Sequence, residues 1–171
     1  MKRFTIYKFF LAALLCGAAA WQTAEAQQNA NSLVCLRTAD AVTQDVQLHD
    51  WLYRLQPTMF INEHSVAVHP VGEAASVLEC VPSQTEKLYQ DKGGFEQVKV
   101  IKIKLQTADA VLSLDLERLR AFPNLHYVWV VYEYDACGDA AEDCLPNLLE
   151  QGITHGEAAP DVKVLYELNN G

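Results

Sequence analysis

Cysteine and histidine are the residues of this chain whose types and spacing could support chemistry. Four of the five cysteines, Cys35, Cys80, Cys137 and Cys144, lie beyond the N-terminal apolar segment. An even number in an exported chain favours disulfides over free thiols. We expect Cys137–Cys144 to close the polar loop CGDAAEDC, which leaves Cys35–Cys80 as the second bridge. Zinc is the alternative, but a C-x6-C spacing without an adjacent histidine lacks the usual ligand pattern.

The five histidines do not form a metal-binding motif. His64 and His69 are five residues apart, so on one strand their side chains would point to opposite faces. His49, His126 and His155 lie far from them in the sequence, and no H-E-x-x-H spacing occurs. We therefore expect ordinary surface or core histidines and no metal site.

An acidic segment carries the other candidate cation ligands. The loop from Asp135 to Asp143 contains Asp135, Asp139, Glu142 and Asp143. Oxygen ligands in a constrained loop can hold Ca²⁺, but the alternating D-x-D-x-D pattern is missing. A solvated acidic loop is the favoured interpretation.

Sequence signatures of nucleophilic or nucleotide-dependent catalysis are missing. The chain has no G-x-S-x-G, P-loop or G-x-G-x-x-G motif. Trp129 and its neighbouring tyrosines Tyr127, Tyr132 and Tyr134 could line a pocket, although aromatics on a central strand more often belong to a core. Three lysines are interpreted as exposed strand residues: Lys99, Lys102 and Lys104. No catalytic residue and no cofactor is predicted.

The N-terminus reads as an export signal. Lys2, Arg3 and Lys8 precede the apolar run 9–20. Ala24-Glu25-Ala26 then places small residues at the positions that precede a signal-peptide cleavage site. The run is too short for a membrane span, which needs about 20 apolar residues. Lipid attachment at Cys16 fits poorly because a leucine precedes it. We predict a signal peptide over 1–26, a disordered leader over 27–32 and one exported domain, periplasmic or secreted, over 33–171.

The net charge narrows the possible partners. It is −9 at pH 7 for the whole chain, and loss of the basic leader makes the remainder more acidic. Such a surface repels phosphate backbones and anionic lipid heads. We therefore do not expect nucleic acid as a partner. The expected kind of partner is another protein in the envelope or outside the cell.

The segment from Gln97 to Asp135 predicts the fold class. A strand over 98–105 is followed by a helix over 113–122 and by the apolar strand 126–134. Because that last strand is apolar on both faces, we expect it at the centre of a sheet covered by helices. Strand–helix–strand units favour parallel pairing with right-handed crossovers. The predicted class is α/β, with α+β as the alternative.

The remaining elements follow from apolar spacing and from turn residues. The pattern predicts a helix over 44–55, a hairpin formed by 59–61 and 65–69, and a helical turn or two over 84–90. A short helix is expected over 145–151. Strands are expected over 33–37 and 162–168.

A seven-residue stretch occurs twice. Leu36–Val42 and Leu105–Val111 match at six positions around a common TADAV sequence. Both copies follow a predicted strand and precede a predicted helix. A duplicated strand–helix unit explains this, and shared turn chemistry is the alternative.

The second copy leads into a pattern that resembles a leucine-rich repeat. Leu112-Ser-Leu114-Asp-Leu116 is followed by Phe122-Pro123-Asn124-Leu125, and Leu125-x-x-Val128-x-Val130 has the repeat's rhythm. The likeness covers about one repeat, and Glu133 stands where Asn or Cys normally closes the turn. The resemblance implies a ligand-binding scaffold rather than an enzyme.

These observations favour an exported, non-catalytic binding or envelope-associated interaction domain of unknown ligand. One alternative is a metal-dependent hydrolase whose site draws on distant His and Asp or Glu residues. The other is a secreted inhibitor that inserts the loop 135–143 into its target.

Overall fold

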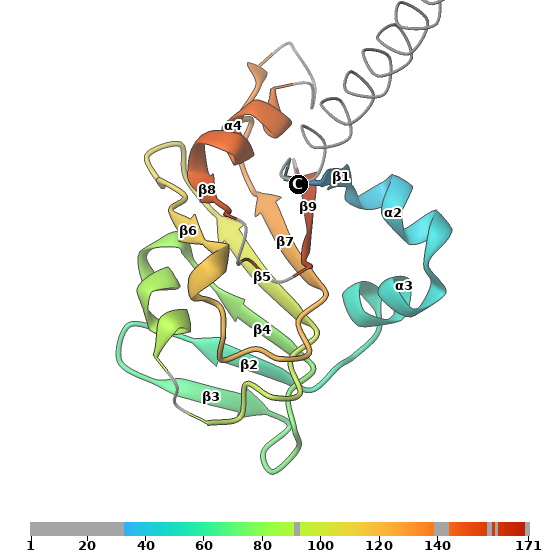
Figure 1. The fold of residues 1–171 in the computed structure, drawn as a ribbon, viewed down its shortest axis with the longest axis vertical. Coiled ribbons are helices and arrows are strands. Elements are labelled where there is room, and N and C mark those ends of the chain that lie inside the picture. Colours follow the sequence, from blue (N-terminus) through green and yellow to red (C-terminus); the bar gives the residue numbers. More distant parts are fainter. Residues whose placement is uncertain (1–32, 91–92, 139–143, 157–158, 160, 170–171) are drawn as a thin grey trace, which may run out of the picture. The chain divides into compact units, whose positions relative to one another are not determined.

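Residues 33–171 form a single small α/β domain, as the sequence predicts (Figure 1). The structure, a computed structural model, describes residues 33–90, 93–138, 144–156, 159 and 161–169. The predicted signal peptide 1–26 and leader 27–32 lie outside the described residues.

The domain is built on a seven-stranded sheet in the order β1-β9-β7-β5-β4-β2-β3. Its strands are β1 (Cys35–Arg37), β2 (Thr58–Ile61), β3 (Val66–His69), β4 (Val77–Cys80), β5 (Val100–Leu105), β7 (Tyr127–Tyr132) and β9 (Lys163–Leu168). β3 pairs antiparallel with β2 as the predicted hairpin, while the other neighbours in the sheet pair in parallel. The hairpin thus extends a largely parallel sheet, and the class is α/β.

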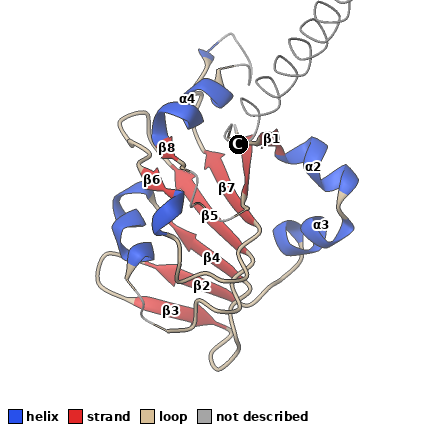
Figure 2. Ribbon diagram, in the orientation of Figure 1, coloured by secondary structure: helices blue, strands red, loops and turns tan. Residues whose placement is uncertain are grey.

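Short helices and a second, two-stranded sheet connect these strands (Figure 2). The helices are α2 (Thr38–Gln44), α3 (Val46–Tyr53) and α4 (Leu145–Gly152), with 3₁₀ helices η1 (Pro82–Tyr89) and η2 (Leu116–Arg118). The second sheet pairs β6 (Leu114–Asp115) with β8 (Ile153–Thr154) in parallel.

One face of the main sheet, the crossover face, carries most of the connections. From β4 onward, each strand of the main sheet lies next to the strand that follows it in this sheet along the chain. The order is β4, β5, β7, β9. The elements between them, η1, β6, η2, α4 and β8, contribute to one continuous core with the inward side chains of these strands. Figure 1 shows them together on one side of the sheet.

The opposite face is covered by α2 and α3, which join β1 at one edge to β2 near the other. Here the buried set is small, with Ala41 and Leu48 from the helices over Val77, Val100 and neighbouring strand residues. Asp45 caps α3 by accepting a hydrogen bond from Leu48 N at 3.1 Å. We call this surface the α2–α3 face.

β7 occupies the predicted central position. Its six residues are all buried, with side chains alternating between the two cores. A strand covered on both faces has no polar side, which is why the sequence YVWVVY shows no alternation.

The predicted helix over 113–122 is wrong in extent. Leu114 and Asp115 form strand β6, and only Leu116–Arg118 coils, as a 3₁₀ turn capped by Asp115. Leu116, Leu119 and Phe122 are buried as the pattern requires. The apolar spacing therefore reports burial here, and it does not report a regular helix.

One of the two predicted disulfides forms. Cys137 and Cys144 are bonded, whereas Cys35 and Cys80 are free thiols, so the expected Cys35–Cys80 bridge is wrong. β9, β7 and β5 lie between their strands. At about 4.8 Å per strand this separation is roughly 19 Å, far beyond the roughly 7 Å limit for bonded Cα atoms. Burial raises the pKa of the Cys35 thiol to about 11 and of the Cys80 thiol to about 12.

Candidate functional site

The α2–α3 face carries a group of charged residues on its central strands. A cross-strand row runs over it from Phe60 through Glu79 and Lys102 to Trp129. Such positions are normally apolar where a helix covers a sheet. Together we call the following five residues the charged cluster: Glu79, Lys102, Lys104, Trp129 and Glu167.

Glu79 lies between the two lysines. Its carboxylate oxygens are 2.7 Å from Lys104 Nζ and 4.0 Å from Lys102 Nζ. The three side chains are only 21–26 % exposed. Lys102 and Lys104 are therefore half-buried and paired, which corrects their interpretation as exposed strand residues.

Lys102 lies over an aromatic ring. Its Nζ is 4.1 Å from the ring centroid of Trp129, a distance typical of a cation–π contact. Burial, reinforced by the nearby charge of Lys104, lowers the pKa of Lys102, and Glu79 and Glu167 oppose that shift. The cluster thus holds charges of both signs in partly desolvated positions.

Two atoms of the cluster lack hydrogen-bond partners. Within the described part of the chain, neither Trp129 Nε1 nor Glu167 Oε2 has one, although both atoms are buried. Buried polar atoms in native proteins are nearly always paired with protein, water or ligand. The hydrogen bonding of the charged cluster is therefore incomplete within the described chain.

Helix α3 borders the cluster. Tyr53, its last residue, is 52 % exposed, and its ring meets the Trp129 ring edge-on at a centroid distance of 6.3 Å. The helix is held to the sheet by Tyr127, whose hydroxyl donates to Asp45 Oδ2 at 2.9 Å. Burial and the Asp45 carboxylate raise the pKa of Tyr127 to about 12.

Two hollows open at the carboxyl ends of the parallel strands, where open α/β sheets place their ligands. One, of about 360 Å³, is lined by Ser83, Lys104, Thr107 and Asp109 among others. The second, of about 330 Å³, is lined by aromatic and aliphatic side chains that include Tyr132 and Tyr134. Lys104 belongs to both the first hollow and the charged cluster.

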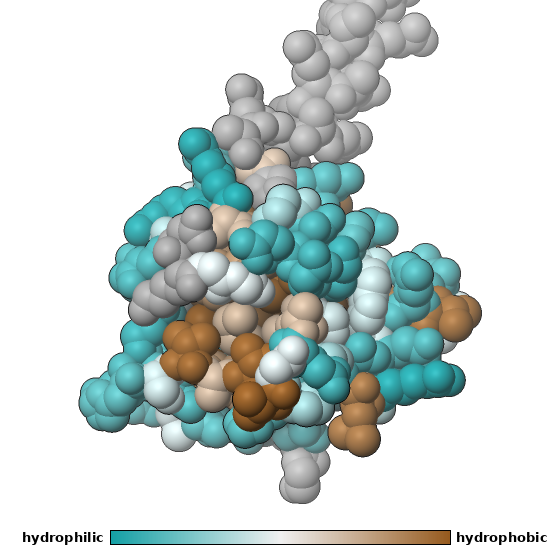
Figure 3. Space-filling view, turned by 90° about the horizontal axis from the view of Figure 1, so that it is seen from below, coloured by the Kyte–Doolittle hydropathy of each residue, from teal (hydrophilic) through white to brown (hydrophobic). Residues whose placement is uncertain are grey.

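An apolar groove of about 470 Å³ lies between the start of β2 and the end of β3. Phe60, the first residue of the cross-strand row, lines it together with Leu55 and Pro70. Leu55 is fully exposed. Hydrophobic atoms also gather on the side of the molecule that faces down in Figure 1, as Figure 3 shows.

The histidines are distributed over the domain. His49 lies on α3, His64 in the β2–β3 turn, His69 at the end of β3, His126 before β7 and His155 after β8. Among the described residues, no three His, Cys, Asp or Glu side chains are grouped so that they could hold a metal ion.

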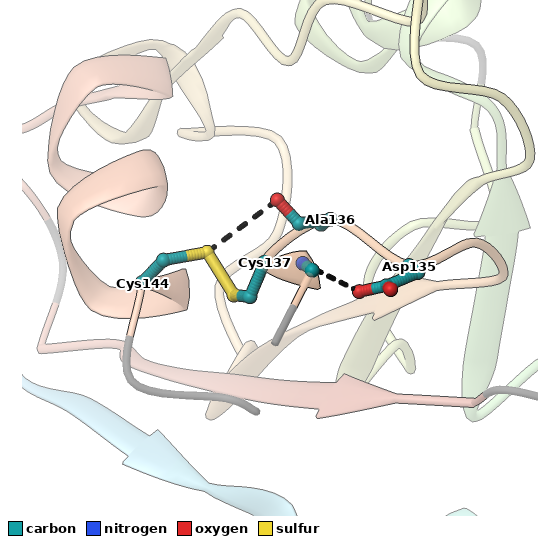
Figure 4. Close-up of a disulfide and its surroundings, with 5 residues drawn as sticks. Asp135, Ala136, Cys137 and Cys144 are labelled. Carbon is teal, nitrogen blue, oxygen red and sulfur yellow. Dashed lines mark hydrogen bonds between the residues drawn. A yellow bond between two sulfur atoms is a disulfide. The ribbon is translucent and has the colours of Figure 1, made fainter. Parts of the chain in front are cut away.

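The acidic loop after β7 is described only in part, because residues 139–143 lie outside the described ranges. Asp135 Oδ1 accepts a hydrogen bond from Gly138 N at 2.7 Å (Figure 4). Gly138 has a φ of +58°, a conformation that suits glycine. The disulfide then joins this turn to Cys144, at the start of α4.

Sequence reasoning named some members of the candidate site without recognising the site. It noted the lysines of β5 and the aromatics of β7, but it did not connect them with Glu79 or Glu167. The available signal was a pair of lysines at alternate positions in a strand whose neighbours are apolar on both faces.

No family model matches the chain, and neither the curated proteins nor the solved structures compared with it gave a match. Among the residues that the structure describes, none of the helices has the length and apolar character needed to cross a membrane.

Proposed function

We propose that this protein is an exported, non-catalytic binding domain whose binding surface is the α2–α3 face. The observation that carries the proposal is the charged cluster, in which a buried indole N–H and a buried carboxylate oxygen have no partner in the described chain. Leaving such atoms unpaired costs about 1–3 kcal/mol each. A bound molecule that pairs with them would recover that free energy.

We further propose that the strands from β4 to β9 form a leucine-rich-repeat-like arrangement. Its support is that β4, β5, β7 and β9 are adjacent in chain order, with their connections on the crossover face. In leucine-rich repeats each strand is followed by a helix or 3₁₀ turn, and the strands line one face. The α2–α3 face is the corresponding strand-lined surface in this chain.

Export is supported by the leader sequence and is compatible with the Cys137–Cys144 bridge, since disulfides persist in oxidising compartments. A partner in the envelope or outside the cell follows from that location. Neither alternative function, metal-dependent hydrolase or secreted inhibitor, is favoured by a specific contact.

The test compares two charge reversals on opposite sides of the sheet. Lys104→Glu disturbs the charged cluster, where Lys104 pairs with Glu79. Arg118→Glu is the matched control, because Arg118 pairs with Glu86 at 3.1 Å beside η1. Each protein is cross-linked in the cells that export it, and the captured molecules are quantified by mass spectrometry.

We expect Lys104→Glu to lower capture of the partner at least several-fold and Arg118→Glu to leave it unchanged. Circular dichroism and the melting temperature establish that both variants fold. Capture that survives Lys104→Glu but is lost with Arg118→Glu would move the binding surface to the crossover side and overturn the proposal.

A further inference from the structure

The two unpaired atoms of the charged cluster are of opposite hydrogen-bonding kind. Trp129 is 5 % exposed, and its Nε1–H can only donate. An ionised Glu167 can only accept, and its Oε2 is buried without a donor in the described part of the chain. Trp129 pairs in register with Leu165, so Glu167 is its diagonal neighbour on the same face. The Glu167 carboxylate is near enough to Tyr53 and Lys102 to influence the pKa of both side chains.

The surrounding charges restrict what that group can be. A carboxylate or phosphate entering here would approach Glu79 and Glu167, and an ammonium would approach Lys102 and Lys104. A neutral group that both accepts and donates hydrogen bonds is repelled neither by the two glutamates nor by the two lysines. A hydroxyl does so through a single atom.

Tyr53, which lies beside the two unpaired atoms, favours a ligand that contains a ring with apolar C–H groups. Tyr53 is half-exposed, and its ring lies against the edge of Trp129. Tyrosine presents an apolar ring and a polar hydroxyl at the same surface. A peptide fits this face less well than such a ring. An added peptide strand pairs with backbone groups at the edge of a sheet, whereas the face of a sheet presents side chains.

We infer that the part of the α2–α3 face bounded by Tyr53, Lys102, Trp129 and Glu167 binds an uncharged saccharide. One sugar hydroxyl accepts a hydrogen bond from Trp129 Nε1 and donates one to Glu167 Oε2, while the sugar ring packs on Tyr53. Entry of the ligand requires the Lys102 side chain, which lies over the Trp129 ring and 4.0 Å from Glu79, to move aside. This inference rests on the proposed function, because it gives the ligand class for the same face.

Calorimetric titration of the purified protein with neutral oligosaccharides tests the inference. The probes are maltohexaose, cellohexaose and N-acetylchitohexaose, with polygalacturonate as the anionic comparison. Trp129→Phe keeps an aromatic ring, smaller than the indole, but removes the N–H, and Glu167→Gln removes the charge of the acceptor. Trp51→Phe is the matched control, because Trp51 stacks on His126 at 5.6 Å, outside the proposed site.

We expect at least one neutral probe to bind, and polygalacturonate not to bind. Trp129→Phe should raise the dissociation constant roughly 2- to 10-fold, and Glu167→Gln by about 10-fold. Trp51→Phe should leave it unchanged. Tyr53→Ala, a change at an exposed position, should also weaken binding, so the test does not depend on buried substitutions being tolerated.

Absence of binding to all three neutral probes overturns the saccharide assignment, as does binding that the Trp129, Glu167 and Tyr53 variants leave intact. Preference for polygalacturonate, or for a peptide presented in the same titration, overturns it too. If sugars fail while Lys104→Glu still lowers partner capture, the ligand class is wrong and the binding face stands. If both experiments fail, the face itself is wrong.

Discussion

The two faces of the main sheet are covered by different amounts of chain. On the crossover face, side chains of β2, β4, β5, β7 and β9 pack against five further elements in one continuous core. On the α2–α3 face, two helices of seven and eight residues cover a smaller apolar group and leave charged residues beside it. The same strands therefore serve a structural role on one side and carry polar chemistry on the other.

This difference shows how a short α/β chain can be stable while one face of its sheet carries charged residues. Fully buried apolar side chains each contribute about 1.5–3 kcal/mol, and most of them here point to the crossover face. The α2–α3 face can then carry paired and unpaired polar atoms without loss of the fold. Each of the following tests separates the two faces, in order of decreasing effect.

The largest difference is expected between two adjacent valines of β7. Val130 is fully buried on the crossover face, and Val131 is 3 % exposed on the α2–α3 face. Val130→Ala should lower the free energy of unfolding by about 2–3 kcal/mol and Val131→Ala by about 1 kcal/mol, because neighbours of Val131 can close the cavity more readily. Urea denaturation measures both. Equal losses would show that the two cores are packed alike.

Removal of the disulfide should have the next largest effect, on the crossover side. Cys137→Ala with Cys144→Ala frees the connection between β7 and α4, and the short closed loop predicts a loss of about 2 kcal/mol. Thermal unfolding of the double variant is compared with that of the oxidised wild-type protein, and the reduced wild-type protein should match the variant. An unchanged stability would mean that α4 is held by its buried leucines alone.

Asp45 should matter less, and its effect should depend on pH. The N–H of Leu48 and the hydroxyl of Tyr127 lower the pKa of Asp45, so its stabilisation is present above the unfolded pKa, about 3.9. It is lost as the pH falls through the lower folded value. Asp45→Ala should cost about 1 kcal/mol at neutral pH and nothing once the wild-type carboxyl is protonated.

Denaturation curves over a pH series test this expectation, with Asp50→Ala as the control. Asp50 forms an exposed i, i+4 pair with Arg54 at 2.9 Å, a kind of pair that contributes about 0.3–0.5 kcal/mol. A loss for Asp45→Ala that persists at acid pH would assign its role to packing and not to its charge.

The smallest effect on stability is expected within the charged cluster. Glu79→Gln removes a partly exposed ion pair with Lys104, and such pairs contribute about 0–1 kcal/mol. Glu86→Gln, the equivalent change beside η1, is the comparison. A loss of several kcal/mol for Glu79→Gln would make the cluster a structural element and would weaken its assignment as a binding surface.

The main sheet could be predicted because local signals agree with the fold. YVWVVY lacks a polar side since β7 is covered twice, and Pro70 follows the predicted hairpin where β3 ends. The segment 113–122 could not be predicted in detail. Its leucines report burial, but pairing of β6 with β8, some 40 residues away in sequence, draws Leu114 and Asp115 into a strand.

The TADAV repeat shows the same dependence on distant contacts. Thr38 is buried, donates to the Tyr166 carbonyl at 2.9 Å and begins helix α2. Thr107 lies in an exposed turn after β5. Identical residues therefore adopt different structures, and no local pattern distinguishes them. The charged cluster was hidden for a related reason, since its members come from β4, β5, β7 and β9.

Strand β1 pairs in parallel with β9, so the first and last strands of the domain are neighbours. The sheet is therefore incomplete until β9 has been synthesised. Before β9 pairs with it, one edge of β7 has no hydrogen-bonded neighbour. The sequence of β7 contains Tyr, Val and Trp without a charge or a proline. An unpaired edge of this composition promotes association between nascent chains. A chain truncated before Lys163 should consequently aggregate, and it should not persist as a smaller soluble domain.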